Sequence, residues 1–212
     1  MLVNLSENYD APSLMREELD EDPIEQFNKW FEDVLEIKIR MPNAMTLATC
    51  TQDGTPSARV VLLKECTQKG FTFYTNYQSQ KGQELVVNPK AALVFYWVEL
   101  HRQVCIRGKV VKENAAVSTQ YFQSRPRESQ IGAWASPQSS VIANREVLDK
   151  QVLEVQEKFA EAEKLPRPEH WGGFLLKPEV IEFWQGRPNR LHDRFRYSRR
   201  KEGGWEINRL AP

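Results

Sequence analysis

The sequence predicts a mainly β protein of the α+β class: an antiparallel β-barrel, closed or nearly closed, with flanking helices. About seven or more short runs rich in β-branched and aromatic residues are separated by turn signals such as QDGTP, TQKG and VNPK. Few of these runs alternate with helical patterns, which argues against a doubly wound parallel sheet. Neither G-x-G-x-x-G nor G-x-x-x-x-G-K-S/T occurs, which excludes a Rossmann dinucleotide loop and a P-loop.

The 212 residues, of which 41% are hydrophobic, suffice for one domain with a proper core. Residues 1–21 carry few large apolar side chains, so we predict an N-terminal arm that is either mobile or docked on the fold. The single domain is expected over residues 22–212. It opens with an amphipathic helix in PIEQFNKWFEDVLE, because Asp22 can cap it, Pro23 suits its first turn and apolar residues recur at helical spacing.

The remaining elements follow in order along the chain. Strands are expected in AMTLATCT, ARVVLLK, FTFYTN, AALVFYWV and RQVCIRGKVVK, with a short helix in SQKGQELVV. A helical region comes next, with NAAVSTQYFQSR ending before Pro126, a short SQIGAWA, and a long helix from about residue 144 to 163. The chain then returns to strand patterns in WGGFLLK, VIEFWQG, HDRFRYS and GWEINRL, which complete the barrel.

Charge balance and cysteine spacing exclude several classes of protein. The 29 basic and 29 acidic residues give a formal net charge of +0, which argues against a protein that coats nucleic acid or an anionic membrane. The 3 cysteines show no C-x-x-C spacing, and the N-terminal stretch resembles neither an export nor an organelle signal. No apolar run approaches the roughly 18 residues of a membrane span. We therefore expect a cytoplasmic protein with reduced thiols and with no membrane or nucleic-acid partner.

The histidines do not predict a metal site or a hydrolase. His101, His170 and His192 lie far apart in the sequence, and no H-x-x-x-H pair exists. G-x-S-x-G is absent as well. Adjacent residues of a strand point to opposite faces, so Asp193 could not orient His192 as the aspartate of a catalytic triad does.

The segment FWQGRPNRLHDR, residues 183–194, concentrates positive charge beside an aromatic pair. If its second half is extended, Arg190, His192 and Arg194 share one face. Two interpretations remain open. The segment is a solvated edge strand whose cations pair with carboxylates, or it is a wall of donors facing an anionic ligand, with Trp184 as a flat apolar surface. Arg187 is expected to face solvent.

A second group of cations lies in SARVVLLK. Arg59 and Lys64 are separated by five positions, so in regular strand geometry they emerge on opposite faces. One strand could thus serve two anions. The alternative is that both residues merely end an apolar strand with a soluble charge.

A third group lies in QYFQSRPRESQ. Tyr121 and Arg125 share one face of the expected helix, and Pro126 turns the chain so that Ser129 can return near them. A guanidinium with two hydroxyls suits a phosphate. The alternative is a helix end with an exposed arginine.

Several longer motifs follow one another from about Asp22 to Pro212: RVVLLK, FYTN, SRPRESQIGAWAS, QSS, WGG, EFWQG, RLHDRF and the terminal RLAP. Together they resemble the pyridoxine/pyridoxamine 5′-phosphate oxidase family. The resemblance implies an FMN-binding split barrel and a homodimer with FMN at the subunit interface. It also implies oxidation of pyridoxine 5′-phosphate or pyridoxamine 5′-phosphate to pyridoxal 5′-phosphate, in which O2 reoxidises the flavin and yields H2O2.

The resemblance also assigns site residues by motif. The implied FMN contacts are Arg59, Val60, Val61, Leu62, Leu63, Lys64, Tyr74, Thr75, Gln80, Lys81, Gln103, Gln138, Ser139, Trp184 and Arg194. The implied substrate contacts are Lys64, Tyr121, Arg125, Ser129, Arg190, His192 and Tyr9. Arg190 and His192 would hold the reacting end of the substrate. No obligatory nucleophile is expected, because the flavin carries the difficult step.

Two positions depart from the family pattern. The family usually has SRK where this chain has SQK, so Gln80 places a neutral amide where a cation is expected near the flavin phosphate. The family's N-terminal Arg-Arg-x-Tyr segment, which folds over the substrate, aligns with SENY, so only Tyr9 matches. Two other functions remain as alternatives: a different split-barrel flavin oxidoreductase, or a non-enzymatic pyridoxal phosphate-binding protein.

Overall fold

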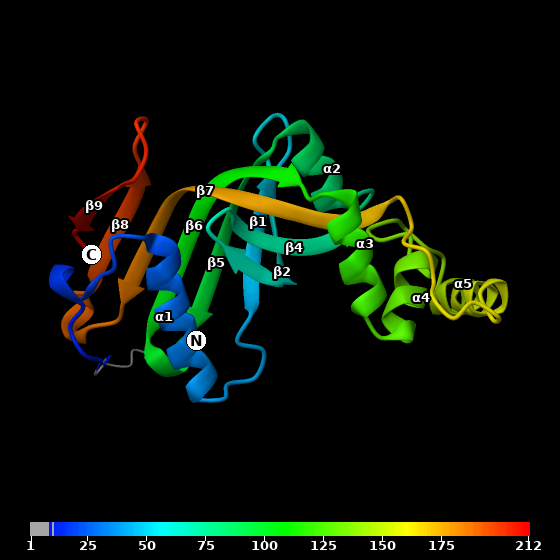
Figure 1. Ribbon diagram of the computed structural model, residues 1–212, viewed down its shortest axis with the longest axis horizontal. Helices are drawn as coiled ribbons and strands as arrows, with labels where there is room; N and C mark the ends of the chain where they lie inside the picture. The colour runs from blue at the N-terminus through cyan, green and yellow to red at the C-terminus, as the bar shows by residue number, and fades with distance from the viewer. Residues whose placement is uncertain (1–8, 10) are drawn as a thin grey trace, which may run out of the picture.

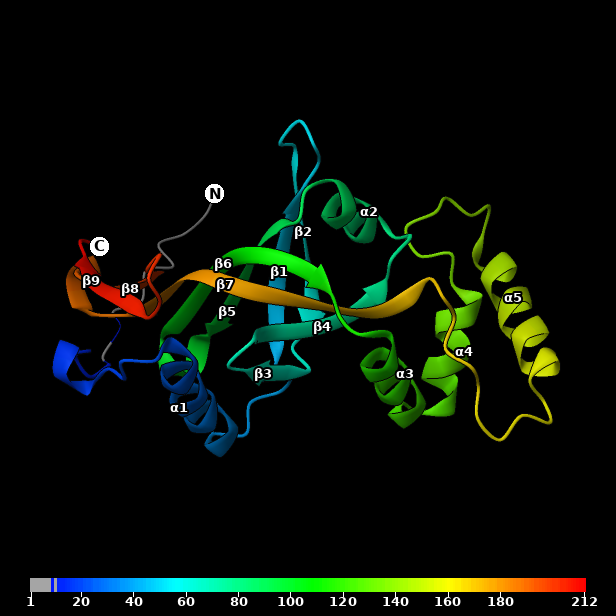
Figure 2. The same cartoon turned by 45° about the horizontal axis from the view of Figure 1, so that its top comes forward.

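The computed structural model describes residue 9 and residues 11–212. The molecule is elongated, with a sheet in the middle and helices at both ends (Figure 1). The helices α3 (Ala115–Ser124), α4 (Arg127–Ala135) and α5 (Arg145–Lys158) gather at one end, and α1 (Pro23–Glu36) lies towards the other. Strand β7 (Trp171–Gln185) runs between these ends in both views (Figures 1 and 2), so its two termini serve different parts of the molecule.

The strands of the described chain form one curled antiparallel sheet. Its order is β2-β1-β5-β6-β7-β4-β3, and β8 and β9 extend it beyond β7. The strands besides β7 are β1 (Ala44–Cys50), β2 (Pro56–Leu62), β3 (Glu65–Thr67), β4 (Gly70–Asn76), β5 (Lys90–Trp97), β6 (Arg102–Lys112), β8 (Asp193–Arg199) and β9 (Trp205–Leu210). The predicted antiparallel split barrel with flanking helices is confirmed, although the short β3 was not predicted.

Strand β7 replaces two predicted strands, WGGFLLK and VIEFWQG. Pro178 does not interrupt it, because the pairing of β7 with β6 shifts its register between Arg107 and Gly108, which leaves Glu179 of β7 as an extra residue next to the proline. The two backbones approach closely here, since a Cβ added to Gly108 would lie 2.0 Å from the carbonyl oxygen of Lys177. The prediction of two separate strands was wrong because a bulge accommodates the proline.

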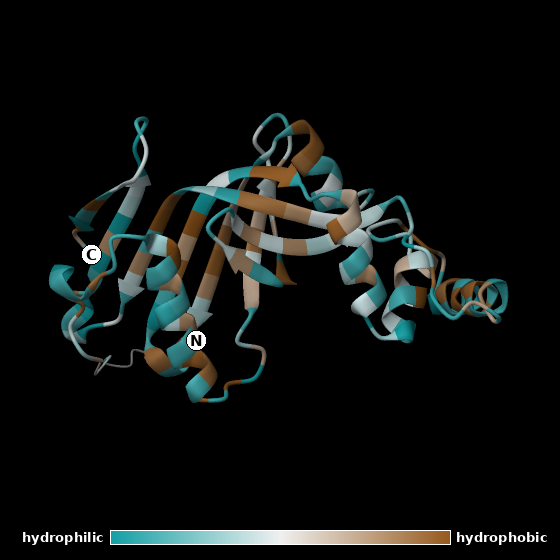
Figure 3. Ribbon diagram, in the orientation of Figure 1, coloured by the Kyte–Doolittle hydropathy of each residue, from teal (hydrophilic) through white to brown (hydrophobic). Residues whose placement is uncertain are grey.

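Aromatic rings fill the interior of the barrel. Phe27 of α1 is fully buried and contacts Phe71 and Phe95, at ring-centroid distances of 5.0 and 5.1 Å. Trp30, from the next turn of α1, packs edge-on against Phe183 of β7. In Figure 3 the central strands alternate between hydrophobic and hydrophilic residues, as expected when one face of a sheet meets the core. Helix α1 therefore closes the barrel with the apolar face that its sequence spacing predicts.

The other predicted helices are present with small changes in length. The short helix is α2 (Gln80–Val87), which begins after Ser79, whose hydroxyl accepts the Gly82 N–H. The long helix α5 begins after its cap Asn144, as predicted, but it ends at Lys158 instead of residue 163. None of the described helices is both long and apolar enough to cross a membrane.

The described part of the N-terminal arm is docked on the fold. Residues 1–8 and 10 of the predicted arm lie outside the described residues. Within residues 11–21, Leu14 is buried in the main core, and its backbone N–H donates to Oδ2 of Asp193 at 3.0 Å. This segment therefore rests on the strands that follow β7.

Candidate functional site

A cavity of about 660 Å³ opens beside the edge strand β2, between β4 and the helices α3 and α4. Its volume is typical of small-molecule sites, which enclose about 300–1,000 Å³. The predicted site residues that line it are Arg59, Val60, Val61, Leu62, Lys64, Tyr74, Thr75, Lys81, Tyr121, Arg125, Ser129 and Gln138. The fold thus brings together residues from widely separated stretches of the sequence.

Three stacked aromatic rings form one wall of this cavity. Tyr74 of β4 stacks on Tyr121 of α3 with centroids 4.0 Å apart, and on Trp171 of β7 with centroids 5.4 Å apart. Burial, with a smaller contribution from Glu113, raises the pKa of Tyr74 to about 12, so its hydroxyl keeps its proton at neutral pH. The stack fixes the position of Tyr121 at the cavity.

The guanidinium of Arg125 lies over the Trp171 ring, 4.6 Å from its centroid. Its Nη1 atom is buried and has no hydrogen-bond partner among the described residues, and burial lowers its pKa. Ser129, in the first turn of α4, and Lys64, whose Nζ is 5.9 Å from the centroid of the Tyr121 ring, line the same cavity. A buried cationic donor without a partner needs an acceptor, and a phosphate oxygen suits it.

Lys81 brings a second positive charge to the cavity. Its Nζ lies 3.1 Å from Oε1 of Gln138 and 3.4 Å from the hydroxyl of Ser79, so its partners in the described chain are neutral. The hydroxyl of Thr75 donates to the same Gln138 oxygen at 3.1 Å. Burial lowers the pKa of Lys81, and the nearby charge of Arg59 lowers it further. An anion at this position would relieve both effects.

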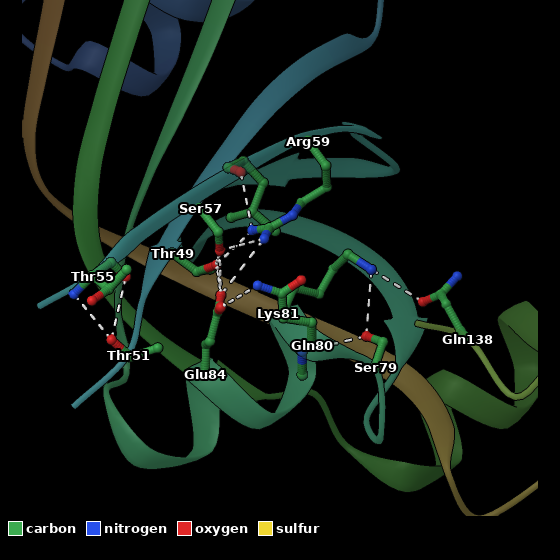
Figure 4. A network of polar contacts seen from close by, with 12 residues as sticks. Thr49, Thr51, Thr55, Ser57, Arg59, Ser79, Gln80, Lys81, Glu84 and Gln138 are labelled. Atoms are coloured by element: carbon green, nitrogen blue, oxygen red, sulfur yellow. Dashed lines mark hydrogen bonds and ion pairs between the residues drawn. The ribbon is translucent and has the colours of Figure 1, made fainter. Parts of the chain in front are cut away.

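Arg59 is held from behind by a polar network (Figure 4). Its two terminal nitrogens donate to the hydroxyls of Thr49 and Ser57, and Nη2 lies 3.6 Å from Oε2 of Glu84. Both hydroxyls in turn donate to Oε2 of Glu84. Burial raises the pKa of this carboxyl, but hydrogen bonds from Ser57, Thr49 and Gln80, together with Arg59, bring it below its ordinary value. The carboxylate is therefore ionised at neutral pH.

Arg59 and Lys64 do not serve separate faces of one strand. Strand β2 ends at Leu62, and the backbone N–H of Lys64 donates to the carbonyl of Thr72 outside the β2–β1 ladder. Both side chains line the same cavity. The expectation of opposite faces was wrong because strand alternation does not continue beyond the strand.

Six of the predicted cofactor contacts do not line this cavity: Leu63, Gln80, Ser139, Gln103, Trp184 and Arg194. The last three lie on other strands and are described below. Leu63 is buried in the main core. Gln80 is exposed and donates to Oε1 of Glu84 at 2.9 Å. Ser139 is exposed and has a φ of 73°.

An aromatic cluster forms at the other end of β7. The rings of Trp184 and His192 lie 4.6 Å apart, and Tyr9 contacts both, at 5.6 and 5.5 Å. Nδ1 of His192 accepts the backbone N–H of Arg187 at 3.1 Å, so the neutral ring carries its proton on Nε2. Burial and the charge of Arg190 lower the pKa of His192, which favours this neutral form. Trp184 is roughly 40 Å from Trp171, the residue of β7 in the cavity wall, when measured along the strand at about 3.3 Å per residue.

The predicted alternation of Arg190, His192 and Arg194 does not occur. Residues Pro188–Arg190 form a 3₁₀ turn, in which Asn189 and Arg190 have left-handed φ values of 57° and 63°. Strand β8 begins only at Asp193. Left-handed residues other than glycine are uncommon and concentrate at functional sites. The turn leaves Arg190 exposed, and none of the ion pairs of the described chain includes it.

Arg187 was predicted to face solvent, but its side chain is bound within the fold. Its Nη1 donates to the carbonyl of Ala11, and its Nε lies 3.6 Å from Oδ2 of Asp193. Arg209 donates to the other oxygen of Asp193 at 2.6 Å. Asp193 thus joins the arm, the turn after β7 and the last strand. The residues next to it in the sequence do not indicate this structural role.

Gln103, Trp184 and Arg194 lie in one row on the outer face of the sheet. They are directly opposite one another in β6, β7 and β8, and directly opposite residues share a face. The register through β1, β5 and β6 places Val60 on this same face. Four strand spacings separate Val60 from Trp184, which amounts to about 20 Å. In one chain, the row of predicted flavin contacts Gln103, Trp184 and Arg194 therefore lies on the same surface as the predicted contact Val60, but not beside it.

Sequence reasoning assigned no role to four residues of this site: Thr49, Ser57, Glu84 and Trp171. The WGG motif drew attention to Trp171, but its stacking partners come from distant elements. The sequence around Glu84 on the short helix α2 gives no sign that its carboxylate binds hydroxyls on β1 and β2. Among the described residues, no group of three or more His, Cys, Asp or Glu side chains could hold a metal ion.

Comparisons with known proteins cover almost the whole chain. Residues 31–159 match the family described as "Pyridoxamine 5'-phosphate oxidase", and residues 171–212 match "Pyridoxine 5'-phosphate oxidase C-terminal dimerisation region". A "Pyridoxine/pyridoxamine 5'-phosphate oxidase" from Salinibacter ruber is 51% identical over 212 residues, which are 100% of this chain and 99% of that protein. A protein of the same name from Trichormus variabilis is 52% identical over 211 residues, 100% of this chain and 98% of that protein.

Solved structures show the same fold. The structure of PhzG from Burkholderia lata 383, in complex with tetrahydrophenazine-1-carboxylic acid, is 30% identical and superimposes with a TM-score of 0.88 over 96% of this chain and 100% of that one. An FMN binding protein from Nostoc punctiforme, described as pyridoxamine 5'-phosphate oxidase-related, is 14% identical with a TM-score of 0.70, over 92% of this chain and 100% of that one. The second likeness concerns the fold alone.

Proposed function

The chain belongs to the pyridoxine/pyridoxamine 5′-phosphate oxidase family, and we propose that it oxidises pyridoxine 5′-phosphate and pyridoxamine 5′-phosphate to pyridoxal 5′-phosphate with FMN. The observation that carries this proposal is one cavity with two groups of cationic side chains. Arg59 and Lys81 form one group, and Lys64 and Arg125 form the other. The phosphate of the cofactor and the phosphate of the substrate would each meet one group.

The group around Lys81 fits the phosphate of FMN. Lys81 is only 8% exposed, its hydrogen-bond partners in the described chain are neutral, and the charge of Arg59 lowers its pKa beyond the effect of burial. The hydroxyl of Thr75 and the amide of Gln138 add polar groups beside it. Residues 59–62 line the cavity next to this group, where a flavin ring can lie. FMN supplies the two-electron acceptor when it is bound, and O2 takes those electrons to give H2O2.

The group around Arg125 fits the phosphate of the substrate. The unpartnered Nη1 of Arg125 would gain an acceptor, and the hydroxyls of Tyr121 and Ser129 can donate to the same phosphate. Each charge-assisted hydrogen bond contributes roughly 1.5–3 kcal/mol. Binding of the substrate phosphate, which lies away from the reacting carbon, would orient the substrate without taking part in the chemical step.

A second copy of the chain would complete the site. Trp184 and Val60 share the outer face of the sheet but lie about 20 Å apart in one chain. In a homodimer that packs these faces against each other about a two-fold axis, Trp184 of one copy can meet Val60 of the other. Val60 is 66% exposed, as a residue awaiting such a partner would be. The match of residues 171–212 to the dimerisation region of the family supports FMN at the interface of a homodimer.

In this assembly, Arg190 and His192 of the second copy would hold the reacting end of the substrate. Arg190 has no ion pair in the described chain, so its charge is available to a ligand. Nδ1 of His192 is occupied by the Arg187 N–H, which leaves Nε2–H to donate to the substrate. Tyr9 packs on His192 and would cover this end of the site.

The structure of PhzG in complex with tetrahydrophenazine-1-carboxylic acid suggests a second candidate, a flavin oxidoreductase for a substrate without phosphate. The unpartnered Arg125 beside Ser129 and Tyr121 favours a phosphorylated substrate instead. Oxygen uptake with phosphorylated and unphosphorylated vitamers distinguishes the two candidates. Rapid uptake only with the phosphorylated compounds is expected.

Co-expression of two impaired variants, assayed with substrate well below the wild-type KM, tests the shared site. Arg125→Ala damages the cavity, and Arg190→Ala damages the part that the other copy would supply. A hybrid dimer of the two variants retains one undamaged site, so random association should restore about a quarter of wild-type activity. Each variant expressed alone is the control. Activity of the mixture no greater than the mean of the controls would contradict a site shared between subunits.

A further inference from the structure

Glu84 lies behind the cationic group that the proposed function assigns to the FMN phosphate, and the inference rests on that assignment. We propose that Glu84 is a positioning residue. Its carboxylate fixes the guanidinium of Arg59 at the cavity through the hydroxyls of Thr49 and Ser57, and thereby determines how tightly the phosphate of the cofactor is bound (Figure 4).

The direction of each hydrogen bond follows from the charge of Glu84. An ionised carboxylate only accepts, so the hydroxyl protons of Thr49 and Ser57 point to its Oε2, at 2.6 Å in the case of Ser57. The lone pairs of both hydroxyls are then left for Arg59. Its Nη1 donates to Thr49, and its Nη2 donates to Ser57 at 2.6 Å. The hydroxyls can accept hydrogen bonds from Arg59 because their own protons are donated in hydrogen bonds to Glu84.

These contacts occupy the terminal nitrogens of Arg59. Nη1 also donates to the carbonyl of Leu47 at 3.3 Å, and Nη2 lies 3.6 Å from Oε2 of Glu84. Of the five N–H donors of a guanidinium, Nε–H is left without a partner among the described residues. The side chain lines the cavity. The network therefore holds the positive charge in place and leaves one donor for a ligand.

A glutamine cannot replace Glu84 in this arrangement. The side chain is 6% exposed, and its other oxygen, Oε1, accepts the amide of Gln80 at 2.9 Å. Both oxygens of Glu84 are thus acceptors, whereas an amide has one acceptor and one donor group. Glu84→Gln removes the negative charge that attracts Arg59. Its NH2 group must also face either Gln80, whose exposed amide would have to turn to accept it, or the hydroxyls that orient Arg59.

The experiment compares two ligands that differ by the phosphate. Apo-protein is titrated with FMN and with riboflavin, and the quenching of flavin fluorescence gives both Kd values. Wild type should bind FMN much more tightly than riboflavin. For Glu84→Gln we expect the Kd of FMN to rise about tenfold, while the Kd of riboflavin stays within about twofold. Gln83→Ala is the control, because Gln83 is an exposed neighbour on α2 whose side chain donates, among the described residues, only to the carbonyl of Gln78.

An equal loss of affinity for FMN and riboflavin would overturn the proposal, because it would show a merely structural role. Tighter binding of FMN would also overturn it, because Glu84 would then only offset positive charge. If Glu84→Gln does not fold, Ser57→Ala removes one orienting hydroxyl and retains the buried carboxylate. An unchanged Kd of FMN in Ser57→Ala would overturn the proposal too. A wild-type protein without preference for FMN over riboflavin would contradict the FMN site itself, which separates the two failures.

Discussion

The two ends of β7 hold their positive charges in different ways. At the cavity end, Lys81 contacts only neutral groups, and Nη1 of Arg125 has no partner among the described residues. At the far end, Asp193 receives both Arg187 and Arg209, and Arg194 lies 2.7 Å from Glu182. Lys81 and Arg125 thus lack carboxylate partners at one end of β7, whereas the arginines named at the other end have them.

The difference indicates which arginines and lysines are available to bind an anionic ligand. Burial of a cation is unfavourable unless a counter-charge or hydrogen bonds compensate for it, so a buried cation without them marks a place for an anion. Cations that already have carboxylates hold the fold together. By this criterion two residues are exceptions. Arg190 has no ion pair in the described chain although it lies at the far end, and Arg59 at the cavity end has Glu84 beside it.

The largest effect is expected for Arg190→Ala. If Arg190 contacts the reacting end of the substrate, kcat/KM should fall about a hundredfold or more, as when a positioning contact of the transition state is removed. Binding of FMN should be retained, which flavin absorbance of the purified variant measures. Near-normal kcat/KM with FMN bound would remove Arg190 from the site.

A smaller effect is expected for Arg125→Ala at the cavity end. Loss of the cation should raise KM for pyridoxine 5′-phosphate about tenfold or more, with a smaller change in kcat, because the phosphate lies away from the reacting carbon. Steady-state kinetics of oxygen uptake provide both constants. An unchanged KM would show that Arg125 does not bind the substrate phosphate.

The smallest effect is expected for Asp193→Asn, which changes stability. The carboxylate is 13% exposed and receives two arginines and the Leu14 N–H, so its loss should cost about 1–2 kcal/mol and lower Tm by about 3–8 °C. Asp149→Asn is the control, since its pair with Arg145 is exposed and should change Tm by less than about 2 °C. Equal shifts in calorimetry would show that the far-end ion pairs are no more important than surface pairs.

Local patterns predicted much of the fold. Alternation and turn signals located most of the strands, and the capping residue Asp22 located the start of α1. Tyr121, Arg125 and Ser129 also line one cavity, because they are close in sequence, on α3, at the junction after it and on α4. Each of these features depends on residues that are close in sequence.

Other features depended on contacts between distant segments. Two strands were predicted where β7 is continuous, because the pairing with β6 shifts its register beside Pro178 and skips Glu179. The turn at Asn189 replaced the extended backbone considered for Arg190 and the residues after it, and Arg187 pairs with Asp193 across that turn. No local pattern contains this information, because each partner is chosen by register and packing.

The sequence by itself determined the antiparallel split barrel, the family and most of the residues around the cavity, since these follow from periodicity and from motifs read along the chain. Only the tertiary structure decided that Glu84 stands behind Arg59, and that Trp184 lies on the outer face with Val60 but far from it. The physical reason is that side-chain alternation is a local property of a strand. Which strands become neighbours, and in what register, depends on hydrogen bonds and packing between segments that the sequence keeps far apart.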